Sequence, residues 1–196
     1  VEAGGELEYV GQPIGLSEDN EPLENRSMLS LNIRNFETFS PMSYAELLLI
    51  KTEAIARGFV SGDAAATYKA ALEASFAYYS DALKSTELDD YNSVKDAYLA
   101  DAINSFDANN YMKQIGIQRW IDATLNGFEG YSVFRRFNFQ QWDEFNPAPG
   151  QPQVPTRYWY SSKTTDRNQA NADEAISRPP LNGNNTKYSY VWWDVE

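Results

Sequence analysis

Hydrophobic residues recur every three or four positions after residue 41, which is the spacing of one face of an α-helix. The first such face consists of Leu47, Ile50 and Ala54, with Leu48 and Ile55 beside it. Ser43 stands at the expected N-cap and Glu46 follows three residues later, as in a capping box. Gly58 is typical of the residue that follows the end of a helix. The pattern therefore predicts a helix between Ser43 and Gly58.

A second helix is predicted from Asp63, a suitable N-cap, to about Leu83. It carries a stripe of small residues, namely Ala66, Ala70, Ala71, Ala74 and Ala77. Small side chains let two helices approach closely, so we expect the two helices to form an antiparallel pair. Core packing explains the stripe better than a peptide-binding groove does, because a groove needs several stacked pairs and no second copy follows.

Two more helices are expected before residue 127. One begins at Asn92 or Ser93 and runs to about Asn104, and the next runs from Asn110 to Asn126. The apolar face of the latter consists of Ile117, Trp120, Ile121 and Leu125. Gly127 is expected to end it.

The rest of the chain lacks helical periodicity. Residues 1–40 contain several glycines and prolines and are interpreted as an irregular linking segment, with a short strand near residues 30–33. Four prolines between residues 147 and 155 predict a long surface loop. The expected organisation is therefore a linking segment at 1–40 and a helical body with long loops and few short strands at 41–196.

Aromatic side chains gather on both sides of this loop, next to amides and carboxylates. A pyranose ring offers an apolar face for stacking and a rim of hydroxyls for hydrogen bonding, so such a mixture is typical of a sugar-binding surface. The candidate ligand-binding residues are Trp142, Phe139, Asp143, Tyr158 and Tyr160. The competing interpretation is that these rings cover the end of the helical core.

Composition narrows the function further. The formal charge of −12 would repel nucleic acid, and the longest apolar run is too short to cross a bilayer. The chain has no histidine and no cysteine, which excludes Ser-His-Asp and Cys-His triads and His-based zinc sites. We expect no cofactor; an oxygen-ligand Ca²⁺ site stays open, although no segment has the pattern of an EF-hand loop.

Three segments in the second half carry a family resemblance. They are residues 114–136, which include Gln118-Arg119-Trp120 and Arg135-Arg136, residues 155–160, and residues 186–194 with Trp192-Trp193. Their order resembles the C-terminal part of the SusD/RagB family, nutrient-binding lipoproteins of Bacteroidetes. The resemblance implies that Trp120 lies in the core and that Arg119 has a buried or half-buried pairing role, with Glu129 or Asp122 as its partner. It also implies that residues 188–194 form a closing strand in which Trp192 and Trp193 are packed.

The resemblance implies a mainly helical protein with a tetratricopeptide-like helix pair, held at the outer membrane and cell surface. Its expected activity is non-catalytic binding of an oligosaccharide or peptide for a SusC-like TonB-dependent transporter. Membrane attachment would come only from an N-terminal lipid anchor that this chain lacks, and we expect the chain to be a fragment of a longer protein. The rival predictions are a glycoside hydrolase that uses Asp143, Glu144 or Asp166, and a helical-repeat scaffold for protein partners.

Overall fold

The structure of the protein is a computed structural model that describes residues 2–3, 6–7, 33, 35, 40–81, 85–101, 104–142 and 154–193. The chain divides into two compact units. The helical unit comprises residues 28–138, and the terminal unit comprises residues 1–27 together with residues 139–196.

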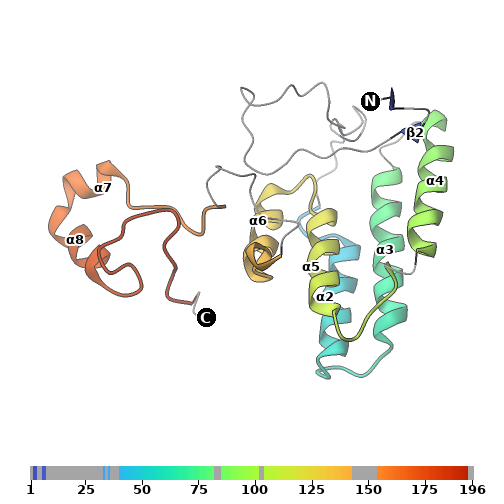
Figure 1. Cartoon of the computed structure of the whole chain (residues 1–196), viewed down its shortest axis with the longest axis horizontal. Coiled ribbons are helices and arrows are strands. Elements are labelled where there is room, and N and C mark those ends of the chain that lie inside the picture. Colours follow the sequence, from blue (N-terminus) through green and yellow to red (C-terminus); the bar gives the residue numbers. More distant parts are fainter. Residues whose placement is uncertain are drawn as a thin grey trace. The chain divides into compact units, whose positions relative to one another are not determined.

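The described elements are mostly helices (Figure 1). In chain order they are β1 (Glu2–Ala3), β2 (Glu6–Leu7), α2 (Tyr44–Ala56), α3 (Ala64–Ser80), α4 (Ser85–Ala100), α5 (Tyr111–Asp122), α6 (Gly127–Arg136), the 3-10 helix η3 (Phe139–Gln141), α7 (Ser162–Arg167) and α8 (Gln169–Ser177). β1 and β2 pair antiparallel, with Glu2 opposite Leu7. The prediction of a mainly helical fold with few short strands is confirmed; the strand predicted near residues 30–33 falls almost entirely outside the described residues.

The predicted helix pair forms the centre of the helical unit. α2 packs against α3 and α5, α6 packs against α5, and α4 lies against α3 (Figure 1). The buried residues at this centre are Ala45, Leu48, Leu49, Tyr68, Ala71, Leu72 and Ile115. Ala71 is fully buried, so the interpretation of the alanine stripe as packing holds at its middle position.

Both caps of the helix pair are confirmed. Ser43 Oγ accepts the Glu46 amide at 2.8 Å, and the Asp63 carboxylate accepts the Ala66 amide at 3.0 Å. Gly58 follows α2 with φ +75°, a conformation that favours glycine. The Glu46 side chain does not return to Ser43, as a full capping box requires, because it is paired with Arg119.

Several helix boundaries differ from the predictions. α4 begins at Ser85, well before Asn92, and α5 ends at Asp122. Gly127 does not end a helix but begins α6, whose N-cap Asn126 accepts the Glu129 amide at 3.2 Å. The sequence signal for α6 was therefore the Asn-x-x-Glu spacing, which competed with the glycine as a stop signal.

The predicted apolar faces are rotated relative to the observed ones. Leu47 is half exposed, whereas Leu49 on the other side of α2 is buried. In α5 the buried residues are Ile115, Gly116 and Arg119, and Trp120 is 40% exposed, so its assignment to the core was wrong. The helix buries its arginine because carboxylates from two neighbouring helices surround the guanidinium.

The C-terminal part of the terminal unit is built from α7, α8 and two loops, residues 154–160 and 184–193. α8 ends before the cis Pro179-Pro180 bond. Thr156 N donates to Lys187 O at 2.8 Å, while Asn185 accepts the Tyr160 amide and donates to the Tyr160 carbonyl, each at 2.9 Å. These bonds join the loops. Residues 188–193 form turns, a bend and irregular backbone, so the closing strand predicted over residues 188–194 is not found in its described part.

Within the described residues, no helix is both long and apolar enough to span a membrane.

Candidate functional site

The buried charges of the helical unit hold helices together. Arg119 donates to Glu46 at 2.8 Å and to Glu129 at 2.9 Å, and its side chain is 8% exposed. The predicted pairing with Glu129 is confirmed, and the sequence had not indicated Glu46, which lies on another helix. Arg136 forms a two-point ion pair with Glu53, at 2.8 and 3.0 Å. The ion pairs with Glu46, Glu129 and Glu53 tie α2, α5 and α6 together.

Glu46 and Glu129 share one guanidinium nitrogen, so their negative charges lie close together. Burial, followed by repulsion from Glu129, raises the pKa of Glu46, and Arg119 opposes this rise. A carboxylate pair can serve acid-base chemistry, but both carboxylates here are bonded to Arg119. The cluster therefore stabilises the helix arrangement.

Asp122 is the second polar junction, at the C-terminal end of α5. Its carboxylate accepts the Ser75 hydroxyl at 2.6 Å and also accepts the Ser43 hydroxyl. The Tyr79 hydroxyl donates to the Asp122 carbonyl at 2.7 Å. Burial is the main reason that the pKa of Tyr79 is raised to about 12. The bonds from Ser43, Ser75 and Tyr79 fix α5 against α2 and α3, which makes Asp122 a structural residue.

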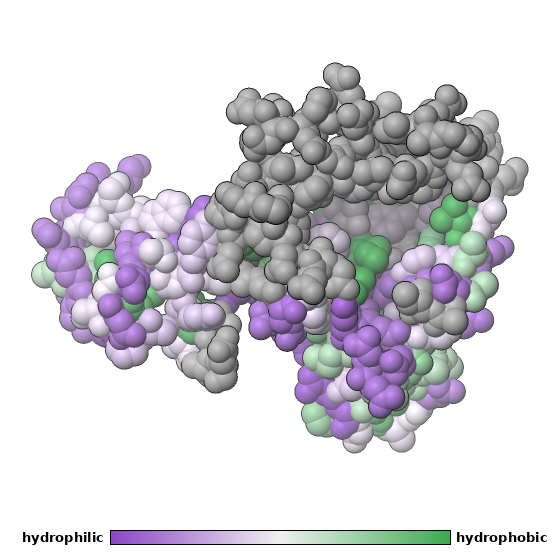
Figure 2. Space-filling view, in the orientation of Figure 1, coloured by the Kyte–Doolittle hydropathy of each residue, from purple (hydrophilic) through white to green (hydrophobic). Residues whose placement is uncertain are grey.

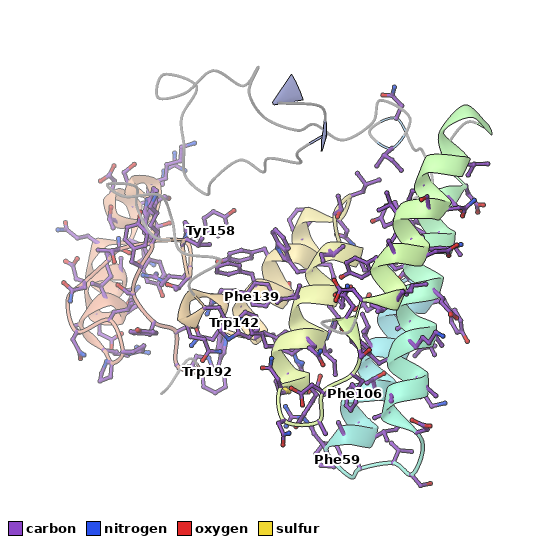
Figure 3. The ribbon with its side chains drawn as sticks, turned by 45° about the vertical axis from the view of Figure 1, so that its right-hand side comes forward. Phe59, Phe106, Phe139, Trp142, Tyr158 and Trp192 are labelled. Carbon is purple, nitrogen blue, oxygen red and sulfur yellow. The ribbon has the colours of Figure 1, made fainter. Side chains whose placement is uncertain are left out.

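The predicted ligand-binding residues fall into two groups in the terminal unit. Phe139 and Trp142 are one group, with ring centroids 4.6 Å apart, and Figure 3 shows the two side chains together. Phe139 is fully buried, whereas Trp142 is only partly buried. Phe139 can therefore support the indole from beneath while Trp142 keeps part of its ring at the surface. Asp143 lies outside the described residues.

Tyr158 and Tyr160 form the second group, on the loop at 154–160. Tyr158 is 93% exposed and Tyr160 is 38% exposed. The Arg157 guanidinium lies 5.3 Å from the Tyr160 ring centroid, and both backbone groups of Tyr160 are bonded to Asn185. The Asn185 contact fixes the backbone beneath the rings, and sequence reasoning had not indicated Arg157 or Asn185 as parts of a site.

The facing loop adds further exposed rings. Trp192 and Trp193 are 76% and 62% exposed, and they contact each other edge to face with centroids 5.3 Å apart. Their assignment to packing was therefore wrong. We define the aromatic loop surface as the exposed rings of both loops, namely Tyr158, Trp159, Tyr160, Tyr190, Trp192 and Trp193. Figure 2 shows that the visible face of the part containing α7 and α8 is mostly pale to purple.

A hollow between α3 and α4 in the helical unit has a volume of about 420 Å³. It is lined by Phe76 and Tyr91, whose ring centroids lie 5.6 Å apart, and by the charged residues Glu73, Lys95 and Asp96. Across the described residues, no group of three or more acidic side chains is placed to hold a metal ion.

Sequence comparison decides the family. Residues 2–161 match the sequence model of a SusD-like family described as "Starch-binding associating with outer membrane". The chain belongs to the SusD-like family. None of the curated protein sequences matches this SusD-like chain.

Solved structures resemble the SusD-like chain over most of its length. A protein described as chitin-binding is 30% identical over 78% of this chain, with a TM-score of 0.57. A SusD homologue from Bacteroides fragilis NCTC 9343 is 22% identical over 78%, with a TM-score of 0.62, and a Bacteroidetes protein described as AC2a SusD-like is 22% identical over 78%, with a TM-score of 0.59. The last two show the fold alone. This chain covers 33%, 34% and 30% of the three structures, so it spans about a third of their length.

Proposed function

We propose that this SusD-like chain binds an oligosaccharide through its aromatic loop surface and does not catalyse a reaction. The observation that carries the proposal is the exposure of six aromatic rings on two loops that are hydrogen-bonded to each other. The family description, starch-binding and associated with the outer membrane, supports a glycan as the ligand. The description of one similar structure as chitin-binding supports the same class.

The physical reason lies in the nature of the rings. Exposed indole and phenol rings leave apolar area in contact with water, which a compact protein usually buries. A pyranose face that stacks on such a ring removes this area from water, and its hydroxyls can bond to nearby amide and hydroxyl groups. Asn184 lies on one of these loops and carries such an amide group, whereas the side chains of Asn185 and Ser189 are already bonded within the loops.

Trp142 is the predicted contact on the other aromatic group. Its ring rests on buried Phe139, which reduces its freedom, so less conformational entropy is lost when a ligand orders it. Asp143 stays a predicted hydrogen-bonding partner of the same ligand. A short peptide is the alternative ligand, because tyrosine and tryptophan also contact peptides well.

The ligand would be held at the outer-membrane surface of the cell and passed to a SusC-like TonB-dependent transporter. The family description associates such proteins with the outer membrane, which supports this location. A longer protein that contains this chain would be attached through an N-terminal lipid anchor. Because the predicted role is to hold an intact ligand, incubation with the ligand should release no shorter products.

Tryptophan fluorescence tests the proposal directly. The full chain is titrated with maltoheptaose, chitohexaose and a hexapeptide, in the natural form and as Trp142→Ala and Tyr158→Ala. Tyr44→Ala is the matched control, because Tyr44 is 67% exposed on α2 in the other unit. We expect a saturable change with at least one glycan, weakened about 5- to 150-fold by each site variant, since an aromatic contact contributes about 1–3 kcal/mol.

Three results would contradict the proposal. The first is that a folded chain binds neither glycan. The second is that Tyr44→Ala weakens binding as much as Tyr158→Ala, which would place the ligand on the helical unit. The third is that only the peptide binds. Chromatography of the mixture after long incubation would show shortened glycan if the protein were a hydrolase.

A further inference from the structure

Two cations belong to the loops that carry the aromatic loop surface. The Arg157 guanidinium lies 5.3 Å from the Tyr160 ring centroid, and the Lys187 ammonium lies 5.2 Å from the Tyr188 ring centroid. The backbones of these two residues are bonded to each other, because Arg157 N donates to Lys187 O at 3.3 Å. Positive charge and stacking rings are therefore parts of the same bonded pair of loops.

Neither cation is neutralised by a carboxylate in the part of the chain that the structure describes. Arg157 instead donates through one guanidinium nitrogen to the Thr186 carbonyl at 3.2 Å. Arg57, Arg119, Arg136 and Arg178, by contrast, lie against glutamates. Arg167 on α7 resembles Arg157 in having no ion pair with a described carboxylate. A guanidinium has five N–H donors and an ammonium has three, so Arg157 and Lys187 retain donors for an anionic ligand.

The charge of this region also departs from that of the chain. Residues 154–196 contain five basic and five acidic side chains and are neutral overall, whereas the whole chain has a net charge of −12. The acidic remainder would repel an anionic ligand more strongly than this neutral segment does. One of the five acids, Glu174, is already bonded to Arg178, and that pairing lowers the pKa of Glu174. An anion is therefore repelled less by this segment than by the rest of the chain.

We propose that the ligand of the aromatic loop surface is an anionic oligosaccharide whose carboxylate or sulfate groups pair with Arg157 and Lys187. This inference rests on the proposed function and makes its ligand class narrower. The sugar faces stack on the exposed rings, and the anionic groups accept charge-assisted hydrogen bonds from the guanidinium and ammonium groups. Arg157 is suited to carboxylate or sulfate because its planar donors match two oxygens at once.

The test compares tetrasaccharides of equal length by titration calorimetry of the full chain. The probes are tetragalacturonate for carboxylate, a sulfated galactan tetrasaccharide for sulfate, and maltotetraose as the neutral control. We expect at least one anionic probe to bind about three- to tenfold more tightly than maltotetraose, because exposed charged contacts contribute modestly. Raising sodium chloride from about 50 mM to about 500 mM should remove this preference, because salt screens exposed charges.

Variants assign the preference to the two cations. Lys187→Gln removes one charge and leaves the loop bonds, because those bonds use the Lys187 backbone carbonyl. Arg157→Lys keeps the charge and removes the planar pair of donors. Each should weaken the anionic probe about two- to fivefold and leave maltotetraose unchanged. Lys163→Gln, on exposed α7 in the same unit, is the control for net charge and should change neither affinity by more than about twofold.

The outcomes separate the two levels of inference. Equal binding of neutral and anionic probes overturns the anionic ligand and leaves the proposed function intact. A preference that Lys163→Gln lowers as much as Lys187→Gln overturns the role of the two cations. No binding of any tetrasaccharide to the folded natural chain overturns this inference, and failure of the longer glycans as well overturns the proposed function.

Discussion

At the scale of single residues, Arg119 is the side chain whose loss should be felt most. It is buried, donates to Glu46 and Glu129, and its guanidinium lies 6.0 Å from the Phe137 ring centroid. Arg119→Met would leave two neighbouring carboxylates without a counter-charge. We expect the free energy of unfolding to fall by about 2–4 kcal/mol, measured by urea denaturation at pH 7.

Lys69→Met is the matched control for that substitution. Lys69 also pairs with a glutamate, but the distance is 4.0 Å and its side chain is 67% exposed. An exposed pair of this kind contributes less than about 0.5 kcal/mol. Equal losses for the Arg119 and Lys69 variants would show that burial of the first pair has no energetic consequence.

Glu46 should make the stability of the protein depend on pH. Burial, followed by repulsion from Glu129, raises its pKa in the folded state above the ordinary value of 4.5. The folded state then holds this proton at pH values where the unfolded state has lost it, so stability falls as pH rises from 4.5 through the raised pKa. Between pH 5 and 8, unfolding free energies measured by urea denaturation should fall more steeply for the natural chain than for Glu46→Gln.

Glu73→Gln is the control variant for these urea titrations. It removes the same charge as Glu46→Gln, but from an exposed residue of α3. If the natural chain, Glu46→Gln and Glu73→Gln all follow parallel pH profiles, the environment of Glu46 does not differ between the folded and unfolded states. The family resemblance had implied a buried or half-buried Arg119 paired with Glu129 or Asp122, and the structure shows Glu129. The sequence could not indicate Glu46, because a contact across 73 positions depends on how α2 and α5 pack.

At the scale of helices, two glycines at helix boundaries should respond in opposite ways to the same change. Gly58 follows α2 with φ +75°, where a Cβ is strained. Gly127 is the first residue of α6, and a Cβ there would meet no atom within 4 Å. We expect Gly58→Ala to lower the melting temperature, because it reduces the free energy of unfolding by about 1 kcal/mol. Gly127→Ala should leave the melting temperature unchanged or raise it slightly. Destabilisation of similar size by both would contradict the different roles of these glycines.

These two positions also show why the helix boundaries were predicted unequally. The end of α2 follows from a local signal, because the glycine itself adopts the terminating conformation. Gly127 does not adopt the positive φ of Gly58, and the N-cap Asn126 determines the start of α6. The buried faces required more than local signals. Alternative stripes of similar hydrophobicity exist on α2 and α5, and the choice between them depends on which neighbour each helix meets.

At the scale of the whole molecule, residue types indicated the ligand-binding candidates, but the sequence could not assemble them into one site. It selected Trp142 and Tyr158 because aromatic and polar residues were mixed around the long loop. The structure gives each a different support: Phe139 lies against Trp142, and the Asn185 bonds hold the Tyr158 loop. Trp192 was misassigned because residue type alone is compatible with a buried or an exposed tryptophan at this position. In its described part, the strand expected at 188–194 is replaced by turns and irregular backbone, and the Trp192 side chain is exposed.

Hydrogen exchange measured along the full chain would locate the ligand. The amides of Thr156, Arg157 and Tyr160 are protected by bonds to the facing loop, and a ligand that bridges both loops should make opening of these bonds rarer. At a ligand concentration of ten times Kd, exchange of peptides covering 154–160 should slow by about tenfold, while α3 keeps its rates. The contrary outcome is slower exchange only in peptides that contain Phe76 or Tyr91. This result would place the ligand in the hollow between α3 and α4. In that case the exposed rings of the loops would need another explanation, and the cations at Arg157 and Lys187 would have no part in binding.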